Sequence, residues 1–107
     1  MNALLDSQLA AFSHPTRRAI LQLTARRERS AGELADSFSV TRPAVSQHIR
    51  VLVNAGLLVE RREHQRRLYR ADAVAVKAFR DQFDRFWASG LAQLKATVES
   101  KHRRPRG

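Results

Sequence analysis

The segment TRPAVSQHIRVLVNAGLL, residues 41–58, decides the fold of this chain. Thr41 is a good N-cap, and Pro43 falls in the first helical turn, where a missing amide hydrogen costs nothing. Gly56 favours the end of the helix. At 100° per residue, three apolar side chains share one face: Val45, Ile49 and Leu52. The segment therefore predicts one short amphipathic helix with a defined start, a buried stripe and a defined end.

The other side of this helix is polar or basic and carries no carboxylate. No acidic residue occurs between positions 41 and 59, whereas a solvated surface helix usually contains Asp or Glu. Arginine binds guanine O6 and N7 in bidentate fashion, and glutamine pairs with adenine N6 and N7. We therefore expect this face to enter the major groove of double-stranded DNA. Its predicted DNA contacts are Thr41, Arg42, Pro43, Ser46, Gln47 and Arg50.

The residues that follow predict a basic β-hairpin, with strands at 57–62 and 67–70 and a turn at 63–66. The turn contains no glycine, so a positive φ would fall on His64 or Gln65. Charge that protects a strand edge is one explanation of the arginines. Their one-sided sign favours contact with phosphates or the minor groove. The expected contacts are Arg61, Arg62, His64, Gln65, Arg66 and Arg67.

The net charge of +10 is concentrated in two places. Residues 41–70 carry seven cations against two carboxylates, and residues 101–107 carry four cations and no carboxylate. This distribution indicates a polyanionic partner, nucleic acid rather than a membrane. No apolar run approaches the roughly 20 residues of a membrane span. The first residues do not resemble a signal peptide, so we expect a cytoplasmic protein.

The flanking sequence predicts helices at 4–12, 15–25 and 31–37, the last opened by a capping box at 30–33. Asp72 would cap a final helix that runs from 73 to about 100. The predicted fold is mainly α with a small β-hairpin wing, a winged helix-turn-helix with a long C-terminal dimerisation helix. We expect a single domain over 1–100 with dimerisation helices at both ends, and a disordered basic tail over 101–107.

The final helix, some 28 residues and about 42 Å long, exceeds what a domain of this size can cover. Part of its aromatic stripe belongs to the core of its own chain, and the excess predicts a homodimer. A two-fold pair of recognition helices would require an inverted repeat with half-sites about 34 Å apart. The expected interface residues are Leu5, Leu9, Phe79, Phe83, Phe86, Trp87, Leu91 and Leu94.

The residues that could carry other chemistry are few. The chain has no cysteine, and its four histidines show no metal-ligand spacing, so we expect no metal, no cofactor and no enzymatic activity. His48 borders the apolar stripe and is expected to be a packed histidine. Two alternatives to a sequence-specific repressor stay open: a non-specific, architectural nucleic-acid binder, and a sensor gated by a ligand or metal. No pattern in the sequence identifies a small-molecule effector.

These segments together resemble the ArsR family of bacterial winged-helix repressors. The resemblance rests on HPTRRAIL (14–21), GELA (32–35), RPAVSQHIRVL (42–52), AGL (55–57) and RRLY (66–69). Their order and spacing cover about residues 8–72, and RFW (85–87) further resembles a cysteine-free subgroup. The resemblance implies a dimer formed through the first and last helices, repression of the protein's own operon, and DNA reading by the helix after the tight turn.

The chain departs from that family pattern at several positions. Metal sensors of the family place cysteine pairs in the helix that corresponds to 31–37, or Asp and His sets in the last helix. Here there is no cysteine, and Asp72, Asp81 and Asp84 have no histidine nearby in the sequence. Metal sensing is therefore not implied. His14 stands where an acidic residue is common, and His64 stands where glycine is common in the wing turn.

Overall fold

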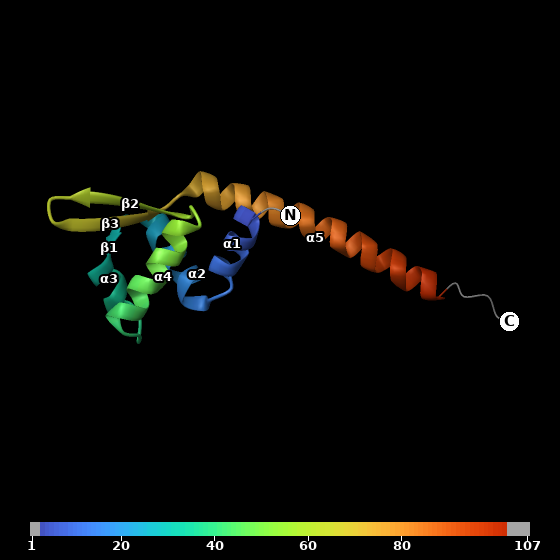
Figure 1. The fold of residues 1–107 in the computed structure, drawn as a ribbon, viewed down its shortest axis with the longest axis horizontal. Coiled ribbons are helices and arrows are strands. Elements are labelled where there is room, and N and C mark those ends of the chain that lie inside the picture. The colour runs from blue at the N-terminus through green and yellow to red at the C-terminus, as the bar shows by residue number, and fades with distance from the viewer. Residues whose placement is uncertain (1–2, 103–107) are drawn as a thin grey trace.

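The computed structural model describes residues 3–102, which form a winged body and a long helix that projects from it (Figure 1). The described part of the chain has the element order α1 (Ala3–Phe12), α2 (Pro15–Arg26), β1 (Arg29–Ser30), α3 (Ala31–Asp36), α4 (Arg42–Asn54), β2 (Leu58–Glu63), β3 (Arg66–Ala71) and α5 (Ala73–His102). The molecule measures 75 × 27 × 23 Å because α5 extends far beyond the body. The expected winged helix-turn-helix fold is confirmed.

Helix α4 begins and ends as the sequence predicts. The Thr41 hydroxyl accepts a hydrogen bond from the Ala44 amide at 3.3 Å. At the other end Gly56 adopts φ 74°, in the left-handed region. The Leu57 amide then donates to the Leu52 carbonyl at 3.1 Å, and the Gly56 amide donates to Val53 at 3.0 Å. These two bonds form a Schellman motif, which satisfies the last carbonyls of the helix and turns the chain into β2.

The sheet has three antiparallel strands in the order β1-β3-β2. Strand β1 pairs Arg29 with Tyr69 and Ser30 with Leu68, and sequence analysis did not predict it. The predicted four-residue turn is also wrong, because Glu63 pairs with Arg66 and only two residues remain between the strands. The physical reason is His64, whose φ of 55° gives the backbone twist that a two-residue hairpin turn needs.

The core lies between the helices of the body and the base of the hairpin. The predicted stripe of α4 is buried, and all three of its members are at most 4% exposed. Leu34 of α3, Ile20 of α2 and Leu57 after α4 pack into the same cluster. This core fixes the angle at which α4 is held, and its other face is left to solvent.

The first turn of α3 is held by the predicted capping box. The Ser30 hydroxyl accepts from the Glu33 amide at 3.1 Å, and the Glu33 carboxylate accepts from the Ser30 amide at 3.1 Å. Replacement of Ser30 by alanine leaves an orphan amide and should lower the free energy of unfolding by about 1 kcal/mol. Urea denaturation followed by circular dichroism measures this loss. Replacement of the exposed Ser7 by alanine is the control, and an equal loss in both variants would contradict the prediction.

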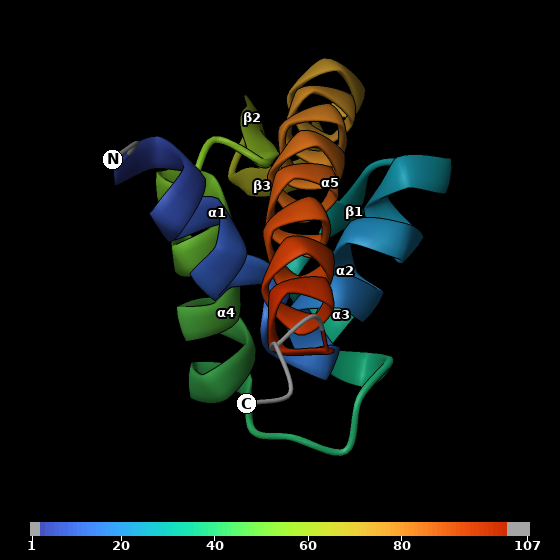
Figure 2. The same ribbon diagram turned by 90° about the vertical axis from the view of Figure 1, so that its right-hand side faces the viewer.

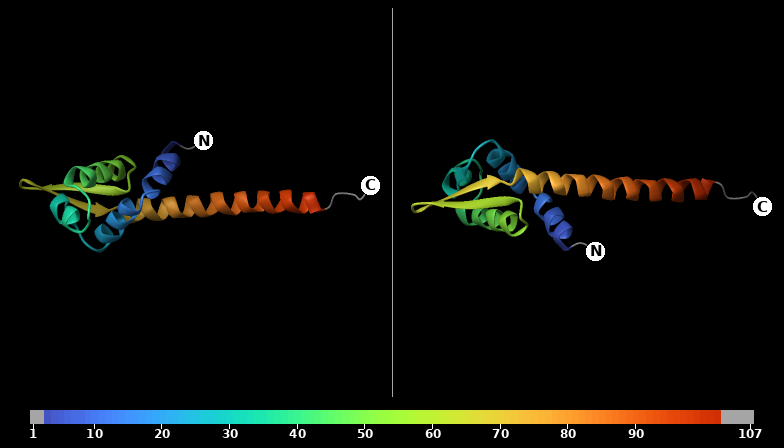
Figure 3. Two further views of the ribbon diagram at one scale, coloured as in Figure 1. Left: turned by 90° about the horizontal axis from the view of Figure 1, so that it is seen from below. Right: turned by 90° about the horizontal axis from the view of Figure 1, so that it is seen from above.

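Helix α5 leaves the body soon after its first turns and continues alone into solvent (Figure 3). In a view along this helix, α1 and α4 lie on one side of it and α2 lies on the other (Figure 2). The helix extends through His102, so the predicted boundary near 100 is two residues short. The sequence has no helix-ending residue, such as glycine or proline, at that position that would have fixed the boundary. The rest of the predicted basic tail, residues 103–107, lies outside the described residues. No helix within residues 3–102 combines the length and apolarity that a membrane crossing demands.

Candidate nucleic-acid interface

Helix α4 presents a continuous polar face to solvent. The exposed residues of this face are the N-cap Thr41 and, within the helix, Arg42, Pro43, Ser46, Gln47, Arg50 and Asn54. The face lies opposite the buried stripe of the same helix, and it contains no carboxylate. The guanidinium of Arg42 lies beside Gly32 at the start of α3. The more C-terminal side chains, Ser46, Gln47 and Arg50, therefore form the freest part of this surface.

The wing brings further cations to the same side of the molecule. Arg50 of α4 meets Arg62 of β2 and Arg67 of β3 around a hollow of about 350 Å³. Alternation along a strand explains this arrangement, because positions 60 and 62 share one face of β2 and are paired with 69 and 67 of β3. The sequence predicts each of these arginines as a contact, but their convergence on one hollow depends on the fold.

A carboxylate that sequence analysis missed lies in this hollow. Glu60 accepts a hydrogen bond from the Tyr69 hydroxyl at 2.9 Å and lies 3.8 Å from the Arg67 guanidinium. Burial, together with the hydrogen bond to Glu60, raises the pKa of Tyr69. Glu60 therefore holds Arg67 and Tyr69 in place. Arg62 has no carboxylate within ion-pair distance among residues 3–102, so its charge is the more available of the two.

The opposite face of the hairpin carries cations that are already paired. Arg61 donates two hydrogen bonds to Glu28 at 2.8 Å and one to Glu63 at 2.9 Å. The hydrogen bond from Arg61 lowers the pKa of Glu28, and the two carboxylates raise that of Arg61. Arg66 donates to Glu33 of α3 at 3.2 Å. Arg61 and Arg66, both predicted as DNA contacts, thus tie the wing to the body. The other predicted wing contacts, His64 and Gln65, form the exposed tip.

Comparison with known proteins places this arrangement in a family. A family model described as a helix-turn-helix domain matches residues 12–61. The HTH-type transcriptional regulator Rv2034 of Mycobacterium tuberculosis is 38% identical over 96 residues, which are 90% of this chain and 90% of that protein. The transcriptional repressor SdpR of Bacillus subtilis is 33% identical over 61 residues, 57% of this chain and 68% of that protein.

Solved structures of ArsR-like regulators share the fold. An ArsR-like transcriptional regulator from Rhodococcus sp. RHA1 matches with a TM-score of 0.74 and 30% identity, over 91% of this chain and 92% of that one. A possible transcriptional regulator for arsenical resistance matches with a TM-score of 0.72 and 40% identity, over 85% and 95% of the two chains. The chain belongs to the ArsR family. As a member of it, the chain is a DNA-binding transcriptional regulator, and the expectation that it is not an enzyme is confirmed by these relatives.

Behind the polar face of α4, two histidines and an arginine form a cluster that sequence spacing did not reveal. The rings of His14 and His48 lie 4.3 Å apart between centroids, and Arg17 Nη1 lies 3.3 Å from His48 Nδ1. His14 also caps α2, because its Nδ1 accepts from the Thr16 amide at 3.1 Å. His48 is half-buried, as expected. Burial, assisted by the charges of His14 and Arg17, lowers the pKa of His48.

This cluster predicts sensitivity to mild acid. Because the pKa of His48 is lowered in the folded state, the unfolded chain takes up a proton first as the pH falls below about 6.5. The free energy of unfolding should therefore decrease from there down to the lower pKa of the folded protein, and His48→Gln should flatten that slope. Denaturation at a series of pH values measures it. The control His64→Asn removes an exposed histidine at a position where asparagine tolerates the positive φ. An unchanged slope in His48→Gln would contradict the prediction.

The ligand sets of the family's metal sensors are not found in the described part of the chain. Within residues 3–102, no three His, Asp or Glu side chains come close enough together to hold a metal ion. The full sequence contains no cysteine. His14 and His48 pack against each other, and His14 caps α2.

The predicted interface residues fall into two groups, one packed against the core of its own chain and one exposed on α5. Phe79 is 7% exposed, and its ring stacks on Phe12 at 4.5 Å, so it belongs to the core of its own chain. Phe83 packs against Phe79 and is also partly covered. Leu5 and Leu9 of α1 are half-buried against the core. The remaining predicted residues are between 44% and 58% exposed: Phe86, Trp87, Leu91 and Leu94.

Proposed function

We propose that this chain acts as a homodimeric, sequence-specific repressor that occupies an inverted-repeat operator, including one beside its own gene. The observation that carries the proposal is the acid-free face of α4, held beside Arg62 and Arg67 of the wing. A regulator that only packaged DNA would need positive charge but not this ordered set of base-reading side chains.

In this proposal α4 lies in the major groove. Gln47 and Arg50 contact base edges, and the hydroxyl of Ser46 contacts a base or a phosphate. Arg62 and Arg67 contact the adjacent phosphates, while His64 and Gln65 reach the neighbouring minor groove from the tip of the hairpin. Arg61 and Arg66 contribute less to affinity, because their carboxylate partners already neutralise much of their charge.

The dimer rests on the exposed apolar stripe of α5. Four large apolar side chains are exposed on the single helix: Phe86, Trp87, Leu91 and Leu94. Full burial of each one would stabilise the protein by about 1.5–3 kcal/mol. A second copy of α5, related by a two-fold axis, covers the stripe on both chains at once. The same axis relates the two α4 helices, so the operator is an inverted repeat with half-sites about 34–36 Å apart.

Repression follows from occupancy of such a site near a promoter, where the bound dimer excludes RNA polymerase. The similarity to a protein named a transcriptional repressor supports this sign of regulation. The test is a binding titration on the DNA upstream of the chain's own gene and on random DNA of equal length. The proposal predicts a preference of at least about 10³-fold for the upstream DNA at physiological salt. Equal affinities would refute it and would favour a non-specific nucleic-acid binder.

A further inference from the structure

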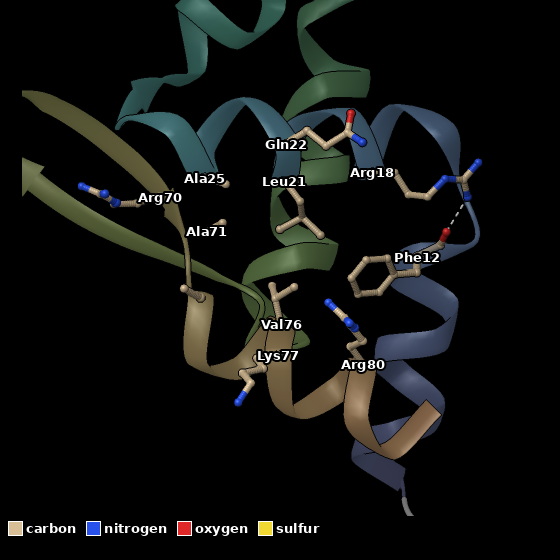
Figure 4. Close-up of a pocket in the computed structure, with 11 residues that line it drawn as sticks. Phe12, Arg18, Leu21, Gln22, Ala25, Arg70, Ala71, Val76, Lys77 and Arg80 are labelled. Atoms are coloured by element: carbon tan, nitrogen blue, oxygen red, sulfur yellow. Dashed lines mark hydrogen bonds between the residues drawn. The ribbon is translucent and has the colours of Figure 1, made fainter. Parts of the chain in front are cut away.

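An apolar cavity of about 460 Å³ lies where α1, α2, β3 and α5 meet (Figure 4). Its walls come from the Phe12 ring, from Leu21 of α2 and from Val76 of α5, which face one another across the space. None of its lining residues belongs to α4 or to the tip of the wing. The volume falls within the range of small-molecule sites, about 300–1,000 Å³. DNA reading as proposed above leaves this cavity unused.

All the charged side chains that line the cavity are cationic, and the neutral Gln22 lines it as well. Four side chains from three elements supply the charge: Arg18, Arg70, Lys77 and Arg80. No carboxylate lines the cavity. Arg18 is partly engaged, because it donates a hydrogen bond to the Phe12 carbonyl. Arg80 forms a long, exposed ion pair with Asp84, at 4.0 Å, and such a pair holds a side chain weakly.

The geometry points to a binding site for a small anionic amphiphile, a carboxylate with an aliphatic chain. The chain would lie against Phe12, Leu21 and Val76, where it removes apolar surface from water. The carboxylate would remain at the rim beside Lys77 and Arg80, whose exposed charges attract an anion without the cost of burying it. Figure 4 shows the Arg80 side chain extending toward the space between Phe12 and Val76. A neutral ligand would form no ion pair with Lys77 or Arg80, and a cationic ligand would be repelled by them.

The position of the cavity connects such a ligand to the projecting helix. The start of α5 is tied to the hairpin base, since Asp72 accepts from the Ala75 amide at 3.1 Å and its own amide donates to the Leu57 carbonyl at 2.9 Å. A ligand between Leu21 and Val76 contacts the body and α5 together. Its binding therefore favours one angle between them. This step rests on the proposed dimer, in which the angle between the body and α5 sets the separation of the two α4 helices. A ligand that favours one angle therefore changes operator affinity.

The site is tested first without DNA, by isothermal titration of the full chain with three ligands that share one aliphatic chain: decanoate, decan-1-ol and decyltrimethylammonium. We expect saturable binding of one decanoate per chain, weaker binding of the alcohol and no binding of the cation. Equal affinity for the anion and the cation would overturn the proposal. So would capture of the protein by phosphatidylglycerol vesicles without binding of monomeric decanoate, because the cationic surface alone would then explain the attraction.

Charge reversal on α5 tests the rim. Lys77→Glu and Arg80→Glu should each weaken decanoate binding about fivefold, the upper range for an exposed ion pair, and leave decan-1-ol binding unchanged. The matched control is Arg85→Glu, which changes the same helix by the same charge at an exposed position that does not line the cavity. An equal effect of Arg85→Glu on decanoate binding would contradict a local site.

The regulatory step is tested by measuring operator affinity with and without decanoate in the wild-type chain and in Arg80→Glu. We expect decanoate to change the affinity of the wild type and to change that of the variant less, and by reciprocity operator DNA should change decanoate affinity by the same factor. Decanoate binding with unchanged operator affinity would overturn the regulatory step. Decanoate binding by a chain that shows no sequence preference would instead refute the proposed function and leave the cavity site intact.

Discussion

Replacement of both Leu91 and Leu94 by glutamate is expected to make the protein monomeric and to weaken binding to an inverted repeat by about 10²–10⁴-fold, the gain that linking two binding sites provides. Both side chains are more than half exposed in the single chain, so the substitutions should leave the winged body folded. In the proposed dimer they are buried against the partner helix, where four carboxylates would have to lose their hydration. Sedimentation equilibrium measures the assembly state.

The matched control for this variant lies on the opposite side of the same helix. At 100° per residue, Ala92 and Ala96 point away from the apolar stripe, and both are exposed. Ala92→Glu with Ala96→Glu adds the same charge to α5 and should preserve the dimer. Trp87 provides a second measurement, because its fluorescence should shift when the wild type is diluted through dissociation. Persistence of the dimer in the leucine variant would contradict the proposed interface.

Replacement of both Gln47 and Arg50 by alanine is expected to remove the preference for operator over random DNA. A bidentate contact to a base discriminates by about 1–3 kcal/mol, and the dimer loses two such contacts in each half-site, so the loss corresponds to at least about 10³-fold in the affinity ratio. Binding to random DNA should persist and remain sensitive to salt, because Arg62 and Arg67 still neutralise phosphates. Titrations on both DNAs at several salt concentrations measure the ratio and the salt slope.

A control with the same residue types separates base reading from a general loss of charge. Gln22 and Arg26 are exposed on α2, outside the polar face of α4. Gln22→Ala with Arg26→Ala removes one amide and one guanidinium, as the α4 variant does, and should keep the affinity ratio. If the α4 variant lost affinity for operator and random DNA by equal factors, α4 would supply charge rather than sequence recognition.

Local features of this fold could be predicted from the sequence because each depends on neighbours in the chain. The cap at Thr41, the left-handed Gly56 and the capping box at Ser30 all involve hydrogen bonds that span six residues or fewer. Strand β1 could not be predicted in this way. It has two residues and no alternation, and it exists because β3 presents a free edge where α2 ends.

The roles of individual charges in the site depended on tertiary structure. Arg61 and Arg62 are adjacent and chemically identical, yet strand alternation turns one toward Glu28 and the other toward the hollow beside Arg50. Glu28 is 33 positions from Arg61, so no local pattern joins them. Apolar periodicity was ambiguous for a related reason. Phe79 and Phe86 fit one stripe of α5, but only the fold places the first against Phe12 and leaves the second exposed.

The most direct test of the central claim, that two α4 helices read DNA as a symmetric pair, is selection of preferred sequences from a random DNA pool by the wild-type protein. The account predicts enrichment of an inverted repeat whose half-sites are about one helical turn apart, roughly 10–10.5 base pairs from centre to centre, or a multiple of that spacing. Base preferences should weaken within each half-site when the selection is repeated with the Gln47 and Arg50 double variant. Enrichment of a single asymmetric site, or of no sequence at all, would contradict the account.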